Sequence, residues 1–116
     1  MKIAVASQNF RTVTPHAGRT RRFLIYEAEP GLTPVEASRL DLPKDLALHQ
    51  WHDAGPHPLD QADVIIAGSC GPGFVERMAA RGIIAVATSE TDPVRAVTAY
   101  LAGTLPAAAG QGSRPC

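Results

Sequence analysis

The sequence predicts a single α/β domain in which helices cover a mixed sheet of about five strands. Three observations carry this prediction. The chain has 116 residues, which suffices for one hydrophobic core but not for a second domain. Short, apolar, β-branched runs at 3–6 and 63–68 are typical of buried strands. The second half alternates such runs with helix-length segments, which indicates parallel strands joined by crossover helices.

In the N-terminal half, the pattern after the first strand predicts a loop and then a hairpin. Residues 8–21 show no periodicity and are expected to form the loop. Apolar residues recur in 22–29 and more weakly in 34–42, and Pro30-Gly31 between them indicates a turn. These two strands are therefore expected to pair in an antiparallel manner. Residues 43–62 are irregular, with a short helix possible over 44–51.

The C-terminal half is predicted to alternate strands and helices. Gly82 and Gly103 are expected to stop two helices, and Thr91, followed by Asp92 and Pro93, to cap the second. The expected elements are a strand over 63–68, a glycine-rich joint over 69–73, a helix over 74–81, a strand over 83–87 and a helix over 94–101. The folded domain is expected to span residues 1–105, and the low-complexity residues 106–116 to form a flexible tail.

Composition excludes several classes of function. Lys and Arg number 11, as do Asp and Glu, so the formal net charge is zero. A nucleic-acid partner bound by bulk charge and a polybasic membrane anchor are therefore not expected. No apolar stretch approaches the ~20 residues that span a bilayer, and the N-terminus does not resemble a signal peptide. Two Cys are too few for a disulfide scaffold. We expect a cytoplasmic protein with reduced thiols.

The joint after the strand over 63–68 is one candidate binding site. Ligands of open α/β sheets bind beyond the carboxyl ends of strands, and amide groups at a helix start favour anions. Gly71 and Gly73 would allow close approach of a ligand, and Cys70 could ligate a soft metal or react. Alternatively, the glycines only shape the turn and Cys70 is a small buried apolar residue. The joint matches neither a Walker loop nor the Gly-x-Ser-x-Gly elbow.

Histidines are a second set of candidates. His16 lies in the first predicted loop, and His49 and His52 are three residues apart, so one helix face could present both. His57 follows in a proline-flanked turn. Imidazole suits iron, zinc and copper, but no zinc-site spacing accompanies these residues. Scattered surface histidines are the alternative interpretation.

Basic residues follow the first strand, and carboxylates are scarce there. Arg11, Arg19, Arg21 and Arg22 could recognise anions, although a solvated loop explains Arg21 and Arg22 better. A nuclease of the ribonuclease H type needs several carboxylates that converge on metal ions. Residues 2–7 contain none, so that chemistry is not expected.

Taken in order, several stretches resemble the dinitrogenase iron–molybdenum cofactor biosynthesis family. This family contains NifX-like proteins and the C-terminal part of NifB. The resemblance covers about residues 1–105. It is carried by residues 1–8, Thr14–Gly18, Phe23–Glu27, Asp63–Gly73, Arg81–Ile83 and Ala96–Gly103.

The resemblance implies a ribonuclease H-like three-layer fold without nuclease chemistry. It further implies a carrier or chaperone that binds iron–sulfur or iron–molybdenum cluster precursors, works with cofactor-assembly proteins and catalyses nothing itself. His16 and Gly18 match the family's His-x-Gly loop, so His16 is the best ligand candidate, and Arg19 would help to retain an anionic cluster. His49 and His52 match a His-bearing segment by position only. Nitrogen fixation itself does not follow from the fold.

Two departures from the family pattern concern these same segments. Ala17 stands where the family loop usually has an aromatic residue, and Ser69-Cys70 stands between glycines of the joint. Cys70 could therefore add a thiolate ligand. Two alternatives remain open: a Cys70-dependent redox protein, and an interaction domain without a ligand that uses segment 43–62 around Trp51.

Overall fold

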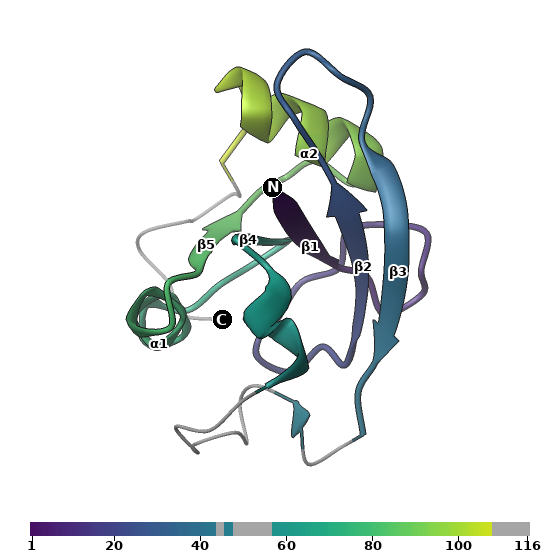
Figure 1. Ribbon diagram of the computed structural model, residues 1–116. Helices are drawn as coiled ribbons and strands as arrows, with labels where there is room; N and C mark the ends of the chain where they lie inside the picture. Colours follow the sequence, from purple (N-terminus) through teal and green to yellow (C-terminus); the bar gives the residue numbers. More distant parts are fainter. Residues whose placement is uncertain (44–45, 48–56, 108–116) are drawn as a thin grey trace.

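A computed structural model describes residues 1–43, 46–47 and 57–107. At its centre lies one five-stranded sheet with the order β3-β2-β1-β4-β5 (Figure 1). β1 pairs antiparallel with β2 and parallel with β4, and β4 pairs parallel with β5. The predicted mixed sheet is therefore confirmed. The strands are β1 (Lys2–Ala6), β2 (Arg22–Glu27), β3 (Val35–Asp41), β4 (Val64–Ala67) and β5 (Ile84–Ala87).

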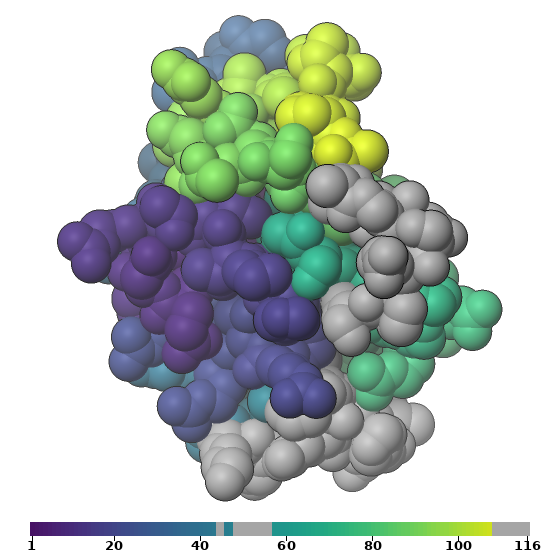
Figure 2. Space-filling model, turned by 180° about the vertical axis from the view of Figure 1, so that it is seen from behind, coloured from purple at the N-terminus to yellow at the C-terminus, as the bar shows by residue number. Residues whose placement is uncertain are grey.

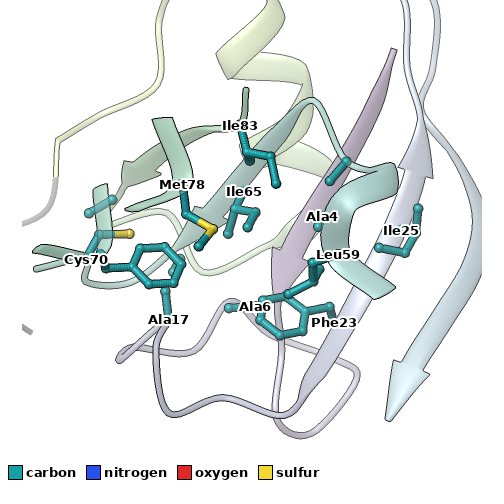
Figure 3. Packing of buried hydrophobic residues seen from close by; sticks show 14 of the residues in the cluster. Ala4, Ala6, Ala17, Phe23, Ile25, Leu59, Ile65, Cys70, Met78 and Ile83 are labelled. Atoms are coloured by element: carbon teal, nitrogen blue, oxygen red, sulfur yellow. The ribbon is translucent and has the colours of Figure 1, made fainter. Parts of the chain in front are cut away.

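Helices cover both faces of the sheet and make the fold three-layered. On one face, α1 (Pro72–Ala80) and the short 3-10 helix η2 (Pro58–Gln61) share a buried cluster with strand side chains such as Phe23 (Figure 3). On the other face, α2 (Pro93–Ala102) buries Val97 in a second cluster. Each fully buried large apolar side chain contributes about 1.5–3 kcal/mol relative to exposure, so the two clusters hold the layers together.

Most predicted elements are confirmed, with shifted ends. β2 and β3 form the expected antiparallel hairpin, with a register irregularity between Ile25 and Tyr26. α1 begins at Pro72 instead of 74, because proline suits the first helical position. The predicted helix over 44–51 lies outside the described residues, apart from positions 46 and 47.

The cap of α2 differs from the prediction. Asp92, and not Thr91, is the N-cap, and its Oδ1 accepts the N–H of Arg95 at 3.1 Å. Thr91 is instead held one position outside the helix, because the carboxylate of Glu90 accepts the N–H groups of both Thr91 and Asp92. A carboxylate is also the better cap electrostatically, since it faces the positive end of the helix dipole.

The end of the described chain contacts the sheet. The Thr88 hydroxyl donates to the Pro106 carbonyl at 2.6 Å, and Ala107 forms an antiparallel bridge with Thr88. Residues 108–116, most of the segment predicted to be a flexible tail, lie outside the described residues. Among the described residues, no helix has the length and apolar character needed to cross a membrane.

Candidate functional site

Two segments that are far apart in the sequence meet where β1 and β4 end. They are the first loop (residues 7–21) and the glycine turn (residues 68–73). The amide of Gly68 donates to the Thr14 carbonyl at 2.9 Å, and the amide of Ala17 donates to the Ser69 carbonyl at 3.1 Å. In Figure 2 the first loop, in purple to indigo, lies beside the teal surface of the glycine turn. The structure thus confirms that the two predicted segments converge.

The topology explains why they converge at this place. β1 and β4 are parallel neighbours, so their carboxyl ends lie at the same edge of the sheet. The chain leaves β1 toward β2 on one side and leaves β4 toward β5 on the other. In open α/β sheets, ligands are bound outside the carboxyl ends of the strands where connections diverge in this way.

Gly68 allows the two segments to approach closely. A Cβ atom at this position would lie 3.1 Å from the backbone N and Cα atoms of Pro15. The Pro15 backbone would have to move by a few tenths of an ångström to admit a side chain here. Glycine therefore favours the close approach of the first loop.

His16 combines a fixed backbone with an exposed side chain. Its φ angle is 61°, in the left-handed region that few residues other than glycine occupy. The His16 amide donates to the Ser69 Oγ at 2.8 Å, and the His16 carbonyl accepts the amides of Arg19 and Thr20 at 2.9 and 3.0 Å. The side chain is exposed, and none of the hydrogen bonds found among the described residues involves its ring. The imidazole can therefore take an external ligand.

The first loop, which contains His16, is basic. The first loop contains Arg11, Arg19 and Arg21 and no Asp or Glu. Arg11 and Arg19 are exposed, and the described part of the chain offers neither of them an ion pair. Arg22 has a structural role instead, because its guanidinium lies 5.4 Å from the centre of the Phe10 ring and its Nη1 donates to the Gln8 carbonyl. This part of the surface therefore favours an anion.

The glycine turn also begins α1. Gly71 is the N-cap, has no side-chain capping bond to offer, and precedes Pro72. The first amides of a helix have no partner within the helix and carry a partial positive charge. Gly73 is exposed and has open space where a Cβ would lie, whereas Gly18 of the first loop is buried.

Cys70 faces the core. Its side chain is 2% exposed, and its Sγ donates to the Val86 carbonyl at 3.5 Å. Figure 3 shows it in the same cluster as Ala17 and Met78. This burial favours the interpretation of Cys70 as a small apolar residue. A role as a thiolate ligand, or as a reactive thiol, stays a prediction that requires the turn to open.

Of the other predicted histidines, the structure describes His57. His49 and His52 lie outside the described residues. His57 is 5% exposed, its Nδ1 accepts the amide of Leu59 at 3.1 Å, and its Nε2 bonds to the Leu46 carbonyl at 2.8 Å. An accepting Nδ1 requires the proton on Nε2, so the neutral ring holds both segments. His57 is a structural residue of η2.

Sequence analysis did not identify Ser69 as a site residue. Its hydroxyl and its carbonyl accept the amides of two consecutive residues, His16 and Ala17. The sequence offered one hint: a serine lies between Gly68 and Cys70, although a glycine-rich turn does not require a serine at that position. Within the described residues, no group of three or more His, Cys, Asp or Glu side chains could enclose a metal ion.

Comparison with known proteins assigns the family. A family model described as dinitrogenase iron-molybdenum cofactor matches residues 1–103. The chain belongs to this family. The resemblance inferred from the motifs is therefore confirmed, and the family's proteins serve in cofactor biosynthesis and transport. No curated protein matches the sequence.

Solved structures of similar fold extend over nearly the whole chain. The protein PH0822 is 18% identical with a TM-score of 0.69, covering 92% of this chain and 94% of its own. The apo form of the orange protein from Desulfovibrio gigas is 23% identical with a TM-score of 0.59, covering 93% and 92%. A Thermotoga protein of the DUF35 family, assigned as a candidate NifB protein, is 19% identical with a TM-score of 0.59, covering 91% of each chain. At these identities the likeness establishes the shared fold.

Proposed function

We propose that this protein carries an iron–sulfur or iron–molybdenum cluster precursor at the surface formed by the first loop and the glycine turn. His16 would be the protein ligand, and the exposed Arg11 and Arg19 would retain the anionic cluster. The protein would receive this cargo from one assembly protein and pass it to another in the cytoplasm, without a chemical step of its own. Family membership supports the class of cargo, and the convergence of the two segments supports the location.

The single observation that carries this proposal is the state of His16. Its backbone is anchored by bonds to Ser69, Arg19 and Thr20, while its imidazole is exposed and makes no hydrogen bond among the described residues. His57, in contrast, uses both ring nitrogens in bonds within the fold. His16 presents an imidazole nitrogen, a ligand type that suits iron.

A carrier also needs a site from which its cargo can leave. One exposed imidazole and two nearby guanidinium groups hold an anionic cluster by few bonds, and the helix start of α1 adds favourable dipoles. Iron–sulfur clusters that are held permanently are usually bound by sets of cysteine thiolates. The only described thiol, that of Cys70, is buried. This arrangement fits reversible binding.

The experiment is reconstitution with iron and sulfide without oxygen, followed by assay of iron and acid-labile sulfide. Wild type is expected to retain both. His16→Ala is expected to lose most of the bound iron, while Cys70→Ala is expected to retain it. The matched control is His57→Asn, which alters a buried histidine and is compared at a temperature where it remains folded.

Each outcome has a defined meaning. Equal iron and sulfide in wild type and His16→Ala would refute His16 as the ligand. Loss of the cluster in Cys70→Ala alone would favour the thiol as ligand and require the glycine turn to open. Absence of iron and sulfide from all variants would contradict the carrier function and favour an interaction domain without a ligand.

A further inference from the structure

We infer that Ser69 is a positioning residue for His16, and that its hydroxyl sets the direction in which the imidazole meets a metal cluster. This inference rests on the proposed function, since it concerns the same site. It starts from the conformation of His16. In the left-handed region the Cα–Cβ bond leaves the chain in a direction that the ordinary conformations do not give, so the backbone sets where the side chain starts and limits where the ring can lie.

A left-handed residue other than glycine persists only where its surroundings impose the conformation. Here the bonds come from both sides of the residue. The His16 amide is held by the Ser69 hydroxyl at 2.8 Å, and the next amide, of Ala17, is held by the Ser69 carbonyl at 3.1 Å. One residue of the glycine turn thus fixes two consecutive peptide groups of the first loop.

Ser69 is itself held in place. The residue before it, Gly68, donates to the Thr14 carbonyl, and a Cβ there would lie 3.1 Å from the Pro15 backbone. The residue after it, Cys70, is buried and bonded to the Val86 carbonyl of β5. The hydroxyl therefore acts from a rigid support.

The Ser69 hydroxyl makes a hydrogen bond that the backbone of residue 69 cannot replace. Alanine or glycine at this position would keep the carbonyl that accepts the Ala17 amide, and so would keep the two segments together. Only the bond to the His16 amide would be lost. Removal of the hydroxyl should therefore alter the orientation of the His16 imidazole while the two segments stay together.

The test compares Ser69→Ala with Ser69→Thr, which keeps a hydroxyl, and with Ser38→Ala, which removes an exposed serine from β3. The first readout uses the protein without metal. Exchange of the His16 amide hydrogen, followed by NMR, is expected to be about fivefold faster in Ser69→Ala, the effect of one hydrogen bond. Ser69→Thr is expected to restore protection, and Ser38→Ala to leave it unchanged.

The second readout is the rate at which iron passes from the reconstituted protein to a chelator. Ser69→Ala is expected to release iron about fivefold faster than wild type. His16→Ala is expected to retain little iron, so in this background the amount of iron that remains bound is compared instead. Adding Ser69→Ala is expected to leave that amount unchanged, because the hydroxyl acts through His16. A merely structural role would lower it further. If Ser69→Ala does not fold, Ser69→Gly replaces it.

The outcomes separate this inference from the proposed function. If His16→Ala loses iron but Ser69→Ala exchanges and releases like wild type, the positioning role is overturned while the carrier function stands. If His16→Ala retains iron fully, the carrier site is wrong. The inference that Ser69 orients His16 toward iron is then refuted as well, even if Ser69→Ala changes the amide exchange.

Discussion

Two histidines of this fold serve opposite purposes, and their contacts show the difference. His57 is buried and uses both ring nitrogens, one toward Leu59 and one toward Leu46. His16 is exposed and is held only through its backbone, chiefly by Ser69. The ring of His57 therefore stabilises the fold, whereas the exposed ring of His16 is the one to which the proposed function assigns a ligand.

The arginines of the two regions differ in the same way. Arg81 makes two bonds of 2.8 and 2.7 Å to the Asp60 carboxylate, which also accepts the His57 amide at 2.9 Å. Arg11 and Arg19 stand in a loop that contains no carboxylate. We call His57, Asp60 and Arg81 the His57 cluster. Its charges are compensated within the cluster, whereas Arg11 and Arg19 of the first loop make no ion pair among the described residues and are available to the proposed anionic cargo.

The largest effect is expected from the two histidines themselves. His57→Ala should lower the free energy of unfolding by about 2–4 kcal/mol, because it leaves a cavity and two buried backbone groups without their partner. His16→Ala should change it by no more than about 0.5 kcal/mol. Urea unfolding measures both. Similar losses of unfolding free energy in His57→Ala and His16→Ala would contradict the contrast between a structural and an exposed histidine.

Glycines of the turn provide the next contrast. Gly68→Ala should cost about 1–3 kcal/mol, because the added methyl group meets the Pro15 backbone, and it should weaken iron retention by displacing the first loop. Gly73→Ala is the matched control, since open space surrounds the position. Its stability should be unchanged or higher. Thermal unfolding and iron assays measure both variants, and equal losses would contradict the assigned close approach.

The His57 cluster should make stability depend on acid. The hydrogen bond from Arg81 holds the pKa of Asp60 below its ordinary value, and the amide of His57 acts in the same direction. A lowered pKa in the folded state stabilises the protein above the unfolded value of about 4, and this contribution is lost as the pH falls through the folded value. Asp60→Asn should therefore cost about 1 kcal/mol at pH 7.

Measurement of the free energy of unfolding as a function of pH tests this dependence on Asp60. The difference between wild type and Asp60→Asn should shrink as the pH falls below about 4. Arg81→Gln should behave alike, because it removes the other partner of the pair. A difference that stayed constant down to pH 2 would show that the ion pair does not contribute.

The smallest effect is expected from single arginines of the first loop. Arg19→Gln should accelerate loss of iron about two- to threefold at low salt, as one exposed charge contributes little. The effect should fade as salt screens the attraction. Arg95→Gln, on exposed α2, is the control for a general change in charge. An equal effect in both variants would indicate bulk electrostatics instead of a local site.

Much of this arrangement could be predicted from the sequence because it depends on local signals. Apolar runs located β1, β4 and β5, and Pro30-Gly31 located the hairpin. The motifs placed His16 and the glycine turn at the ends of two strands. The parallel pairing of β1 with β4, which brings the two segments together, was not predicted and is seen in the structure.

Other features depend on tertiary contacts that no local pattern encodes. The burial of Cys70 follows from which way the turn faces, and the role of Ser69 follows from a bond to a residue that precedes it by 53 positions. The cap of α2 was assigned to Thr91 and is Asp92, because Glu90 holds the preceding amides. The burial of Cys70, the contacts of Ser69 and the N-cap of α2 all depend on side-chain direction or on tertiary partners.

The measurement that tests the central claim most directly is an NMR map of the reconstituted protein. Iron broadens the amide signals of residues near it. We expect the strongest broadening at residues 14–20 and 68–73, with the signals of β3 retained, and we expect recovery of all signals in His16→Ala. Broadening that spared both segments and centred on the His57 cluster, or that persisted in His16→Ala, would contradict the account.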